Sequence, residues 1–174
     1  RTGRYIKNLI HLIFSTMESK ITFLTNDDAK LVRKPWGSEK WLANGSPEFK
    51  YAFKEIFYKS SHKTSLQFHR QKEETEYFVK GKGIFHYSQT VIDIKKYDNG
   101  EYTNEEINEI VNNLLTKVIV PGTLIHVKPG CIHRVEAVED LTMLETSTIE
   151  LDDVIRLHDD SGRPDGHIEN EHSG

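Results

Sequence analysis

The chain has 174 residues, a formal net charge of −4 at pH 7 and 36% hydrophobic residues. These values suit one soluble globular domain with a core of useful size. The acidic balance, without a basic stripe interleaved with aromatic residues, excludes the usual composition of a nucleic-acid-binding protein. A single cysteine, Cys131, excludes an internal disulfide, so we expect a cytoplasmic protein.

The N-terminal stretch needs separate treatment. Residues 6–14 are mostly apolar and follow two arginines, as the core of a signal peptide does. The run is interrupted by polar residues, is too short to span a bilayer and lacks a small-residue cleavage site. We therefore predict no membrane partner and assign residues 1–16 to an upstream segment or a peripheral arm. The domain is expected over 17–163, followed by a polar tail over 164–174.

Most of the domain has the pattern of short strands. Pro35 and Gly37 bracket a turn before a strand-like run at 39–42, and an aromatic-rich run at 49–58 alternates in part. Further short runs lie at 65–69, 76–79, 83–88, 117–120, 123–127, 133–138 and 141–146. Glycine, proline or charged residues separate these runs at intervals typical of an antiparallel β-barrel or sandwich.

One stretch departs from this rhythm. Thr103 and Glu106 have the spacing of a capping box. Apolar residues then follow at helical spacing: Ile107, Ile110, Val111 and Leu114. We predict one inserted α-helix over about 104–115. Its apolar stripe is expected to pack on the core or in an interface, with a functional lid as the alternative.

The chemistry-bearing residues gather in two places. Gln67 and His69 are two residues apart, so in a strand they point to the same face. Glu74 follows five residues later and can join them if the chain bends into a second inward-facing strand. His133 comes three residues after the Pro129-Gly130 turn. Together these four side chains would supply a four-ligand site for a divalent metal.

These spacings resemble the two motifs of the cupin superfamily. Gln67-x-His69-x(4)-Glu74-x(6)-Gly81 is similar to the first motif, with Gln where many members have a His, and Gly122-x(6)-Pro129-Gly-x-x-His133 is similar to the second. Three features more narrowly resemble small cupins related to the C-terminal domain of type II mannose-6-phosphate isomerases. They are Lys34-Pro-Trp-Gly-Ser38, Leu66-Gln-x-His69, and Asp152-Asp-Val-Ile-Arg156 followed by Asp160-Ser-Gly-Arg163.

The resemblance implies a mainly β, double-stranded β-helix (jelly-roll) barrel that carries the inserted helix. It also implies one divalent cation held by Gln67, His69, Glu74 and His133. Zn is the family expectation, and a mixed set of nitrogen and oxygen ligands also admits Mn, Fe, Ni or Co. By analogy with cupins of this size we expect a homodimer, for which the aromatic segment 49–58 would suit the interface.

The first functional hypothesis is a metal-dependent enzyme that acts on a sugar or sugar phosphate, as an aldose–ketose isomerase or an epimerase. Such chemistry needs a Lewis acid and a base beside the acidified C–H bond. Candidates for the base are Glu76, Lys72 and His126. Candidates for holding a phosphate or carboxylate are Arg134, Lys128 and Arg156. A structural ion pair is the alternative for each charged residue, and Asp152, Asp153 and Arg156 could instead clamp the C-terminal segment to the barrel.

Two other functions stay open. The isomerases read Arg-x-Glu-His across the first motif, where this chain has Lys72, Glu73, Glu74 and Thr75. The departure favours a non-catalytic cupin that binds a sugar or another metabolite. An Fe(II) dioxygenase is a further alternative, because His69, Glu74 and His133 would form a two-His, one-carboxylate triad. Gln67 as a fourth ligand counts against it, since oxygen chemistry needs an open position.

Overall fold

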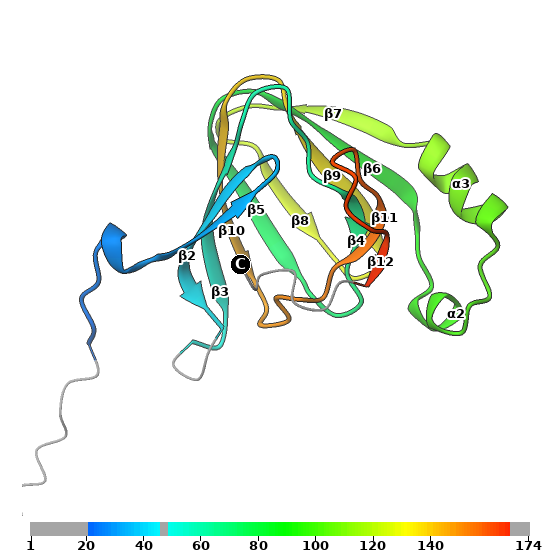
Figure 1. Cartoon of the computed structure of the whole chain (residues 1–174), viewed down its shortest axis with the longest axis horizontal. Coiled ribbons are helices and arrows are strands. Elements are labelled where there is room, and N and C mark those ends of the chain that lie inside the picture. The colour runs from blue at the N-terminus through cyan, green and yellow to red at the C-terminus, as the bar shows by residue number, and fades with distance from the viewer. Residues whose placement is uncertain (1–20, 46–48, 168–174) are drawn as a thin grey trace, which may run out of the picture.

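The computed structural model describes residues 21–45 and 49–167, in which two antiparallel sheets of six strands face each other (Figure 1). The first sheet, in spatial order, contains β1 (Lys30–Lys34), β2 (Gly37–Asn44), β3 (Ala52–Tyr58), β10 (Leu141–Ser147), β5 (Glu74–Lys80) and β8 (Leu124–Val127). The second contains β12 (Gly166–His167), β11 (Ile155–His158), β4 (Leu66–Phe68), β9 (Cys131–Ala137), β6 (Gly83–Val91) and β7 (Leu115–Ile119). A single 3-10 turn, Asn26–Asp28, precedes β1. The predicted jelly-roll architecture is confirmed.

Alternation along the central strands divides the barrel interior into two zones. In β5, Glu74, Glu76 and Phe78 are buried at every second position. In β10, Met143 and Glu145 follow the same rule. The inward positions are therefore apolar toward one end of these strands and charged toward the other. An apolar core fills the first zone, and a buried polar cavity occupies the second.

A second apolar cluster lies beside the barrel, under two helices that follow β6 (Figure 1). These are α2 (Ile94–Asp98) and α3 (Asn104–Asn112). The predicted helix is α3, and both hydrogen bonds of its capping box are present at Thr103. It ends earlier than expected because Leu115 already opens β7. The stretch before it was not predicted to be helical, although Asp93 caps α2.

The glycine of the first motif has a backbone role. Gly81 lies in the turn between β5 and β6 with φ of +85°, and a Cβ there would sit 2.1 Å from the carbonyl oxygen of Asp140. Gly122 has a similar φ of +89° but open space around it. Left-handed backbone costs a non-glycine residue about 1–3 kcal/mol.

We therefore expect Gly81→Ala to lower the free energy of unfolding by more than Gly122→Ala, because only Gly81→Ala adds a backbone clash to the strain. Urea denaturation of both variants measures the difference. Equal losses would show that the turn relaxes around the extra carbon.

Both ends of the chain were assigned outside the domain. The predicted arm at 1–16 lies outside the described residues. Of the predicted tail, Gly166 and His167 pair with β11 as β12, and 168–174 lie outside the described residues. Within the described ranges, the helices are all too short and too polar to cross a bilayer.

Candidate metal centre

Three of the four predicted metal ligands meet inside the barrel. His69 follows β4, Glu74 opens β5 and His133 lies in β9; all three are buried, and their ligand atoms lie within 4.8 Å of one another. Glu74 Oε1 lies 3.3 Å from Nε2 of His69 and 3.1 Å from Nε2 of His133. Two atoms that coordinate one cation at about 2.1 Å are about 3.0–3.4 Å apart. The cluster therefore already has the spacing of a ligand set.

Hydrogen bonds fix the tautomer of both histidines. Nδ1 of His69 contacts the backbone carbonyl of Asp153, and Nδ1 of His133 contacts that of Cys131 at 3.0 Å. A carbonyl only accepts, so in each ring Nδ1 carries the proton. In the neutral form that binds a metal, each ring then turns the lone pair of Nε2 toward the carboxylate of Glu74. Three electron-pair donors face one another, an arrangement that a cation between them would stabilise.

Gln67 lies beside this cluster. It pairs with His133 across β4 and β9, and its side chain lines the same cavity. Its Oε1 accepts a hydrogen bond from the Ser65 hydroxyl at 2.9 Å. To act as the fourth ligand, the amide would have to turn its oxygen away from Ser65. This ligand role of Gln67 stays a prediction.

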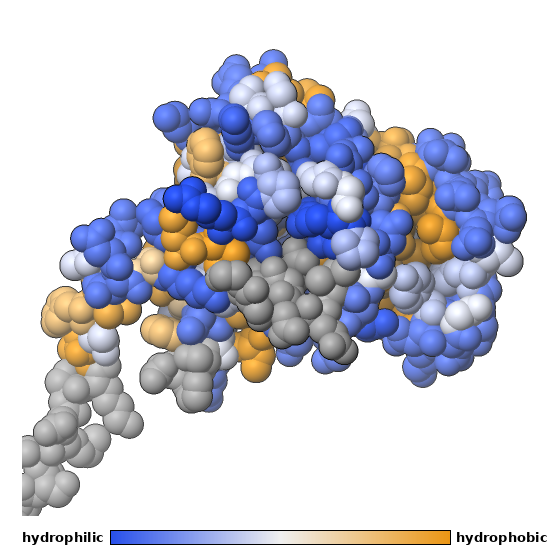
Figure 2. Space-filling view, viewed as in Figure 1, coloured by the Kyte–Doolittle hydropathy of each residue, from blue (hydrophilic) through white to orange (hydrophobic). Residues whose placement is uncertain are grey.

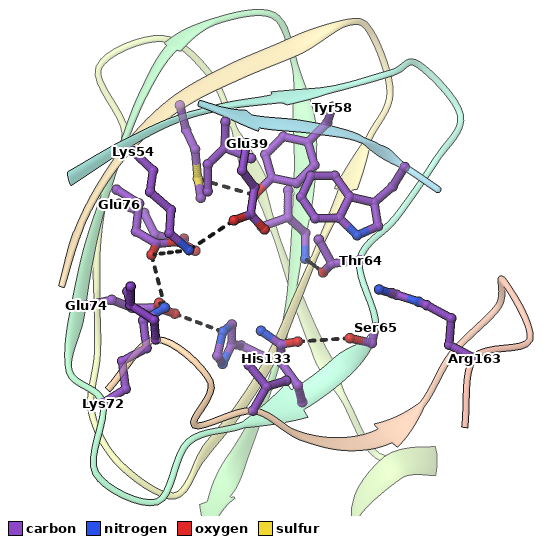
Figure 3. Close-up of a pocket in the computed structure, with 18 residues that line it drawn as sticks. Glu39, Lys54, Tyr58, Thr64, Ser65, Lys72, Glu74, Glu76, His133 and Arg163 are labelled. Atoms are coloured by element: carbon purple, nitrogen blue, oxygen red, sulfur yellow. Dashed lines mark hydrogen bonds and ion pairs between the residues drawn. The ribbon is translucent and has the colours of Figure 1, made fainter. Parts of the chain in front are cut away.

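Glu74 and His133 of the cluster line a cavity of about 60 Å³ inside the barrel (Figure 3). Four glutamates and two lysines line it: Glu39, Glu74, Glu76, Glu145, Lys54 and Lys72. Its apolar lining includes Trp36, Ile56, Tyr58, Val135 and Met143. The C-terminal segment, defined here as residues 151–167, closes it with Leu151, Val154 and Arg163. A divalent cation and a few waters fit this volume, at about 10–15 Å³ per water.

The two lysines join the carboxylates into a buried chain. Lys72 Nζ contacts Glu74 and lies 3.0 Å from Glu145. Lys54 Nζ lies 3.0 Å from Glu39 and 3.8 Å from Glu145. Burial by itself would lower the pKa of Lys72, but the carboxylates of Glu145 and Glu74 outweigh burial and raise it above its usual range. Lys72 is therefore held as an ammonium group, which can donate but does not suit the predicted role of base.

The two neighbouring carboxyls of β5 are held in opposite states. Burial favours the neutral form of Glu74, but the charge of its neighbours, with that of Lys72 the largest, outweighs burial and lowers the pKa of Glu74 well below its usual range. Burial first, and then the charges of Glu74 and Glu145, raise the pKa of Glu76 well above its usual range. Oε2 of Glu76 has no hydrogen-bond partner among the described residues. Glu76 thus lies in the cavity as a carboxyl group with an uncommitted oxygen.

The third predicted base, His126, lies elsewhere. It is exposed in β8 opposite Thr75, and its Nδ1 contacts the Thr75 hydroxyl at 2.8 Å. Thr75 lies between the inward-facing Glu74 and Glu76, so this pair points out of the barrel. The structure does not bring His126 into the cavity. A shift of one residue along β8 would be enough to turn this side chain to the inner face of the sheet.

The three predicted anion-binding residues do not line the cavity either. Nε and Nη2 of Arg134 donate to the carbonyl of Thr64 at 3.0 and 2.7 Å, and this arginine also pairs with Asp160. Lys128 is exposed and pairs with Glu73 on the surface. Arg156 is buried, and its Nη1 donates to the carbonyl of Pro164 at 2.7 Å. Each makes the kind of structural contact that was the alternative for these residues.

Several cavity residues were missed by the sequence reasoning. Glu39, Lys54, Tyr58 and Glu145 come from β2, β3 and β10. The available signal was charge at inward positions of apolar strands, since Lys54 alternates with Ile56 and Glu145 with Met143. The Tyr58 ring stacks on Trp36 with ring centroids 4.9 Å apart. This aromatic pair separates the polar cavity from the apolar core.

Two facing antiparallel sheets around a two-histidine, one-glutamate cluster give the chain the cupin fold. No protein-family model and no curated protein matches the sequence. Oxalate decarboxylase from Bacillus subtilis is similar in structure, with a TM-score of 0.58 and 11% identity over 80% of this chain and 33% of that one. The capsular polysaccharide assembling protein CapF from Staphylococcus aureus is also similar, with a TM-score of 0.55 and 12% identity over 80% of this chain and 33% of that one.

Ectoine synthase from P. lautus is similar over most of its own length, with a TM-score of 0.54 and 12% identity over 74% of this chain and 78% of that one. By contrast, the chain spans only about a third of the CapF and oxalate decarboxylase chains. At these identities the likeness shows the fold, and the function has to be argued from the site.

Proposed function

We propose that the protein is a metal-dependent cupin enzyme that moves protons on a hydroxy-carbonyl compound, as a sugar or sugar-phosphate isomerase or epimerase. The observation that carries the proposal is the convergence of His69, Glu74 and His133 on one point, with Glu74 and His133 lining the same cavity as Glu76, whose Oε2 has no hydrogen-bond partner among the described residues. A metal centre alone would suit a binding protein. A proton-transfer group in the same cavity favours catalysis.

The residues divide the chemistry among them. A divalent cation, when bound to the two histidines and Glu74, would act as a Lewis acid toward a substrate oxygen. Glu76 is placed to take or return a proton inside the cavity. The ammonium groups of Lys54 and Lys72 favour negative charge that develops on a substrate oxygen.

The proposal includes one divalent ion per chain, with Zn first and Mn, Fe, Ni or Co as substitutes, because two imidazoles and one carboxylate do not select strongly among these metals. It also includes a carbohydrate ligand, a homodimer and a cytoplasmic location. These three parts of the proposal rest on the sequence analysis alone.

Metal content tests the first part of the proposal. We expect about one divalent ion per chain by elemental analysis of the purified protein, and loss of most of it in Glu74→Ala, which removes the shared carboxylate.

Metal-loaded protein should convert mannose 6-phosphate to fructose 6-phosphate or epimerise a related sugar, and Glu76→Gln should retain the metal but lose turnover. A wild-type protein that takes up no metal when dialysed against Zn²⁺, Mn²⁺ or Fe²⁺ would contradict the proposal.

One observation favours an Fe(II) dioxygenase as a second candidate. The Gln67 oxygen is engaged by Ser65, which leaves three protein ligands and open positions at the ion. Oxygen uptake by Fe(II)-loaded protein in the presence of a sugar acid would support this candidate. Binding without conversion or oxygen uptake would instead support the non-catalytic cupin.

A further inference from the structure

The polar cavity has room for an ion and a few waters, so most of a substrate has to lie elsewhere. Its volume is about 60 Å³. A larger space of about 360 Å³, called here the side pocket, is lined by residues of β6, β7, β8 and β9, among them Phe85, Ile125 and His133. It lies between β8, at the edge of the first sheet, and the second sheet. His133 lines both spaces, so a predicted metal ligand separates the polar cavity from the side pocket.

Strand register places the side pocket directly beside the metal centre. Tyr87 pairs with His133 across β6 and β9, and Val127 pairs with Glu74 across β8 and β5. Directly paired residues of antiparallel strands project to the same face of their sheet. Tyr87 and Val127, which both line the side pocket, therefore face the barrel interior next to two of the three metal ligands. A ligand in this pocket would have its inner end beside the metal centre.

The walls of the side pocket are mostly apolar. Its inward-facing side chains belong to the apolar core or pack against it: Phe85, Tyr87, Ile125, Val127 and Cys131. The ring of Phe85 is nearly parallel to that of His133, at 14° and with ring centroids 5.9 Å apart. Lys117 and His126 also line the pocket, and both are exposed. Among the described residues that line it there is no carboxylate, whereas four glutamates line the polar cavity.

Two other places do not give the same access to the metal centre. A pocket of about 560 Å³ borders Glu74, but its lining includes Thr75 and Thr146, which pair with each other on the outer face of the first sheet. Figure 2 shows hydrophobic residues gathered beside α3, where the helix packs on the second apolar cluster outside the barrel. Of these three places, the side pocket is the one with inward-facing walls that reach the metal ligands.

We propose that the side pocket binds an apolar group of the substrate, which makes the substrate a hydroxy- or oxo-compound with an aromatic or aliphatic side group. This inference rests on the proposed function, because the hydroxy-carbonyl end of the substrate is placed at the metal centre. An apolar cavity of about 150 Å³ is enough to hold a benzene ring, and the side pocket has about 360 Å³. An apolar group can enter it without separating the buried lysines from their carboxylates.

The test uses pairs of ligands that share a polar end and differ in the apolar group: pyruvate with phenylpyruvate, and lactate with 3-phenyllactate. Isothermal titration of Zn²⁺-loaded protein gives a ratio of affinities for each pair. In the wild type we expect the phenyl member of at least one pair to bind at least about tenfold more tightly, because it buries more apolar surface. Ile125→Trp fills part of the side pocket with a larger ring and should bring that ratio to within about twofold of one.

Val79→Trp is the matched control, because Val79 is 40% exposed on the outer face of β5 and does not line the side pocket. It should leave the ratio unchanged, while metal content and circular dichroism check that each variant is loaded and folded. Cys131 gives a second measurement that needs no substitution, because it is the single cysteine of the chain and lines the pocket. Phenylpyruvate should slow the alkylation of Cys131 by iodoacetamide in the wild type, and pyruvate at the same concentration should not.

Equal affinities within both pairs in the wild type, or a ratio that survives in Ile125→Trp, would overturn the inference. Alkylation of Cys131 that becomes faster on dilution, without any added ligand, would show that a second copy of the chain covers the pocket and would overturn it too. Absence of metal from the wild type would instead count against the proposed function. The pairs can still be titrated into that metal-free protein, where the preference for the phenyl member should persist.

Discussion

Asp153→Ala is expected to weaken the binding of a divalent cation about 10–100-fold, the usual cost of removing a group that orients a metal ligand. The Asp153 carboxylate accepts hydrogen bonds from three successive backbone N–H groups, those of Arg70, Gln71 and Lys72. Its own carbonyl holds Nδ1 of His69. One residue thus fixes both the imidazole and the turn that leads from His69 to Glu74. Without the carboxylate, the carbonyl and the turn lose their common anchor.

Competition titration with Zn²⁺ measures the affinity, and the Nδ1–H proton resonance of His69 reports its orientation in the metal-free protein. Asp153→Asn should be milder, because its amide oxygen still accepts. Asp98→Asn is the control, since the Asp98 carboxylate accepts from the partly exposed side chain of Arg70 at 2.8 Å and not from the backbone of that turn in the described part of the chain. Wild-type affinity and an unchanged His69 signal in Asp153→Ala would refute this role.

The pH dependence of the Asp153 variants has a definite sign. Burial favours the neutral form of Asp153, but the three backbone N–H groups outweigh it and lower its pKa below the usual value of 3.8. A carboxyl with a lowered pKa stabilises the folded state above its unfolded pKa, and this contribution is lost as the pH falls through the folded pKa. The stability difference between the wild type and Asp153→Asn should therefore shrink below about pH 3.8.

Lys72→Met is expected to lower the free energy of unfolding of the metal-free protein by about 3–5 kcal/mol, the cost of breaking a buried ion pair from one side. Only 5% of the Lys72 side chain is exposed, against 2% for Glu74 and 8% for Glu145. Without the ammonium group, two buried carboxylates lose their shared counter-ion. The loss should be smaller in the metal-loaded protein, because the cation supplies positive charge beside Glu74.

Urea denaturation with and without Zn²⁺ provides the measurement. Adding Glu145→Gln to Lys72→Met should restore part of the stability, because it removes one of the two buried carboxylates that lost Lys72. Lys54 does not lose its closest partner in this double variant, since it still pairs with Glu39 at 3.0 Å. Lys40→Met breaks the more exposed pair with Glu55 and should cost less than about 1 kcal/mol. A loss of that small size in Lys72→Met would mean that water reaches the chain of charges.

The grouping of His69 with Glu74 could be predicted from the sequence because the two residues lie close together along the chain. Gln67 lies in β4 and His69 directly follows that strand, and Glu74 opens the next strand after a short turn. Gly81 and the Pro129-Gly130 turn mark fixed positions in the two motifs, so the motifs can be recognised in the sequence. Short strands with regular breaks predicted an antiparallel β-barrel or sandwich, and the resemblance to the cupin motifs implied the jelly roll.

The roles of the other charged residues could not be predicted in this way. His126 differs from an inward-facing residue by one position in its strand, which spacing alone does not resolve. Arg134 and Arg156 donate hydrogen bonds to backbone carbonyls whose position is set by the folded chain. The contact between His69 and Asp153 spans 84 residues, so only the closed barrel reveals it.

The return of residues 151–163 to the barrel has a consequence for how the protein matures. Translation delivers His69, Glu74 and His133 before Asp153 and Arg163. A nascent chain that already contains His69, Glu74 and His133 still lacks Asp153, which binds the turn after His69, and the C-terminal segment that closes the cavity. Ion loading should therefore trail synthesis, becoming tight only once this later stretch has left the ribosome and docked.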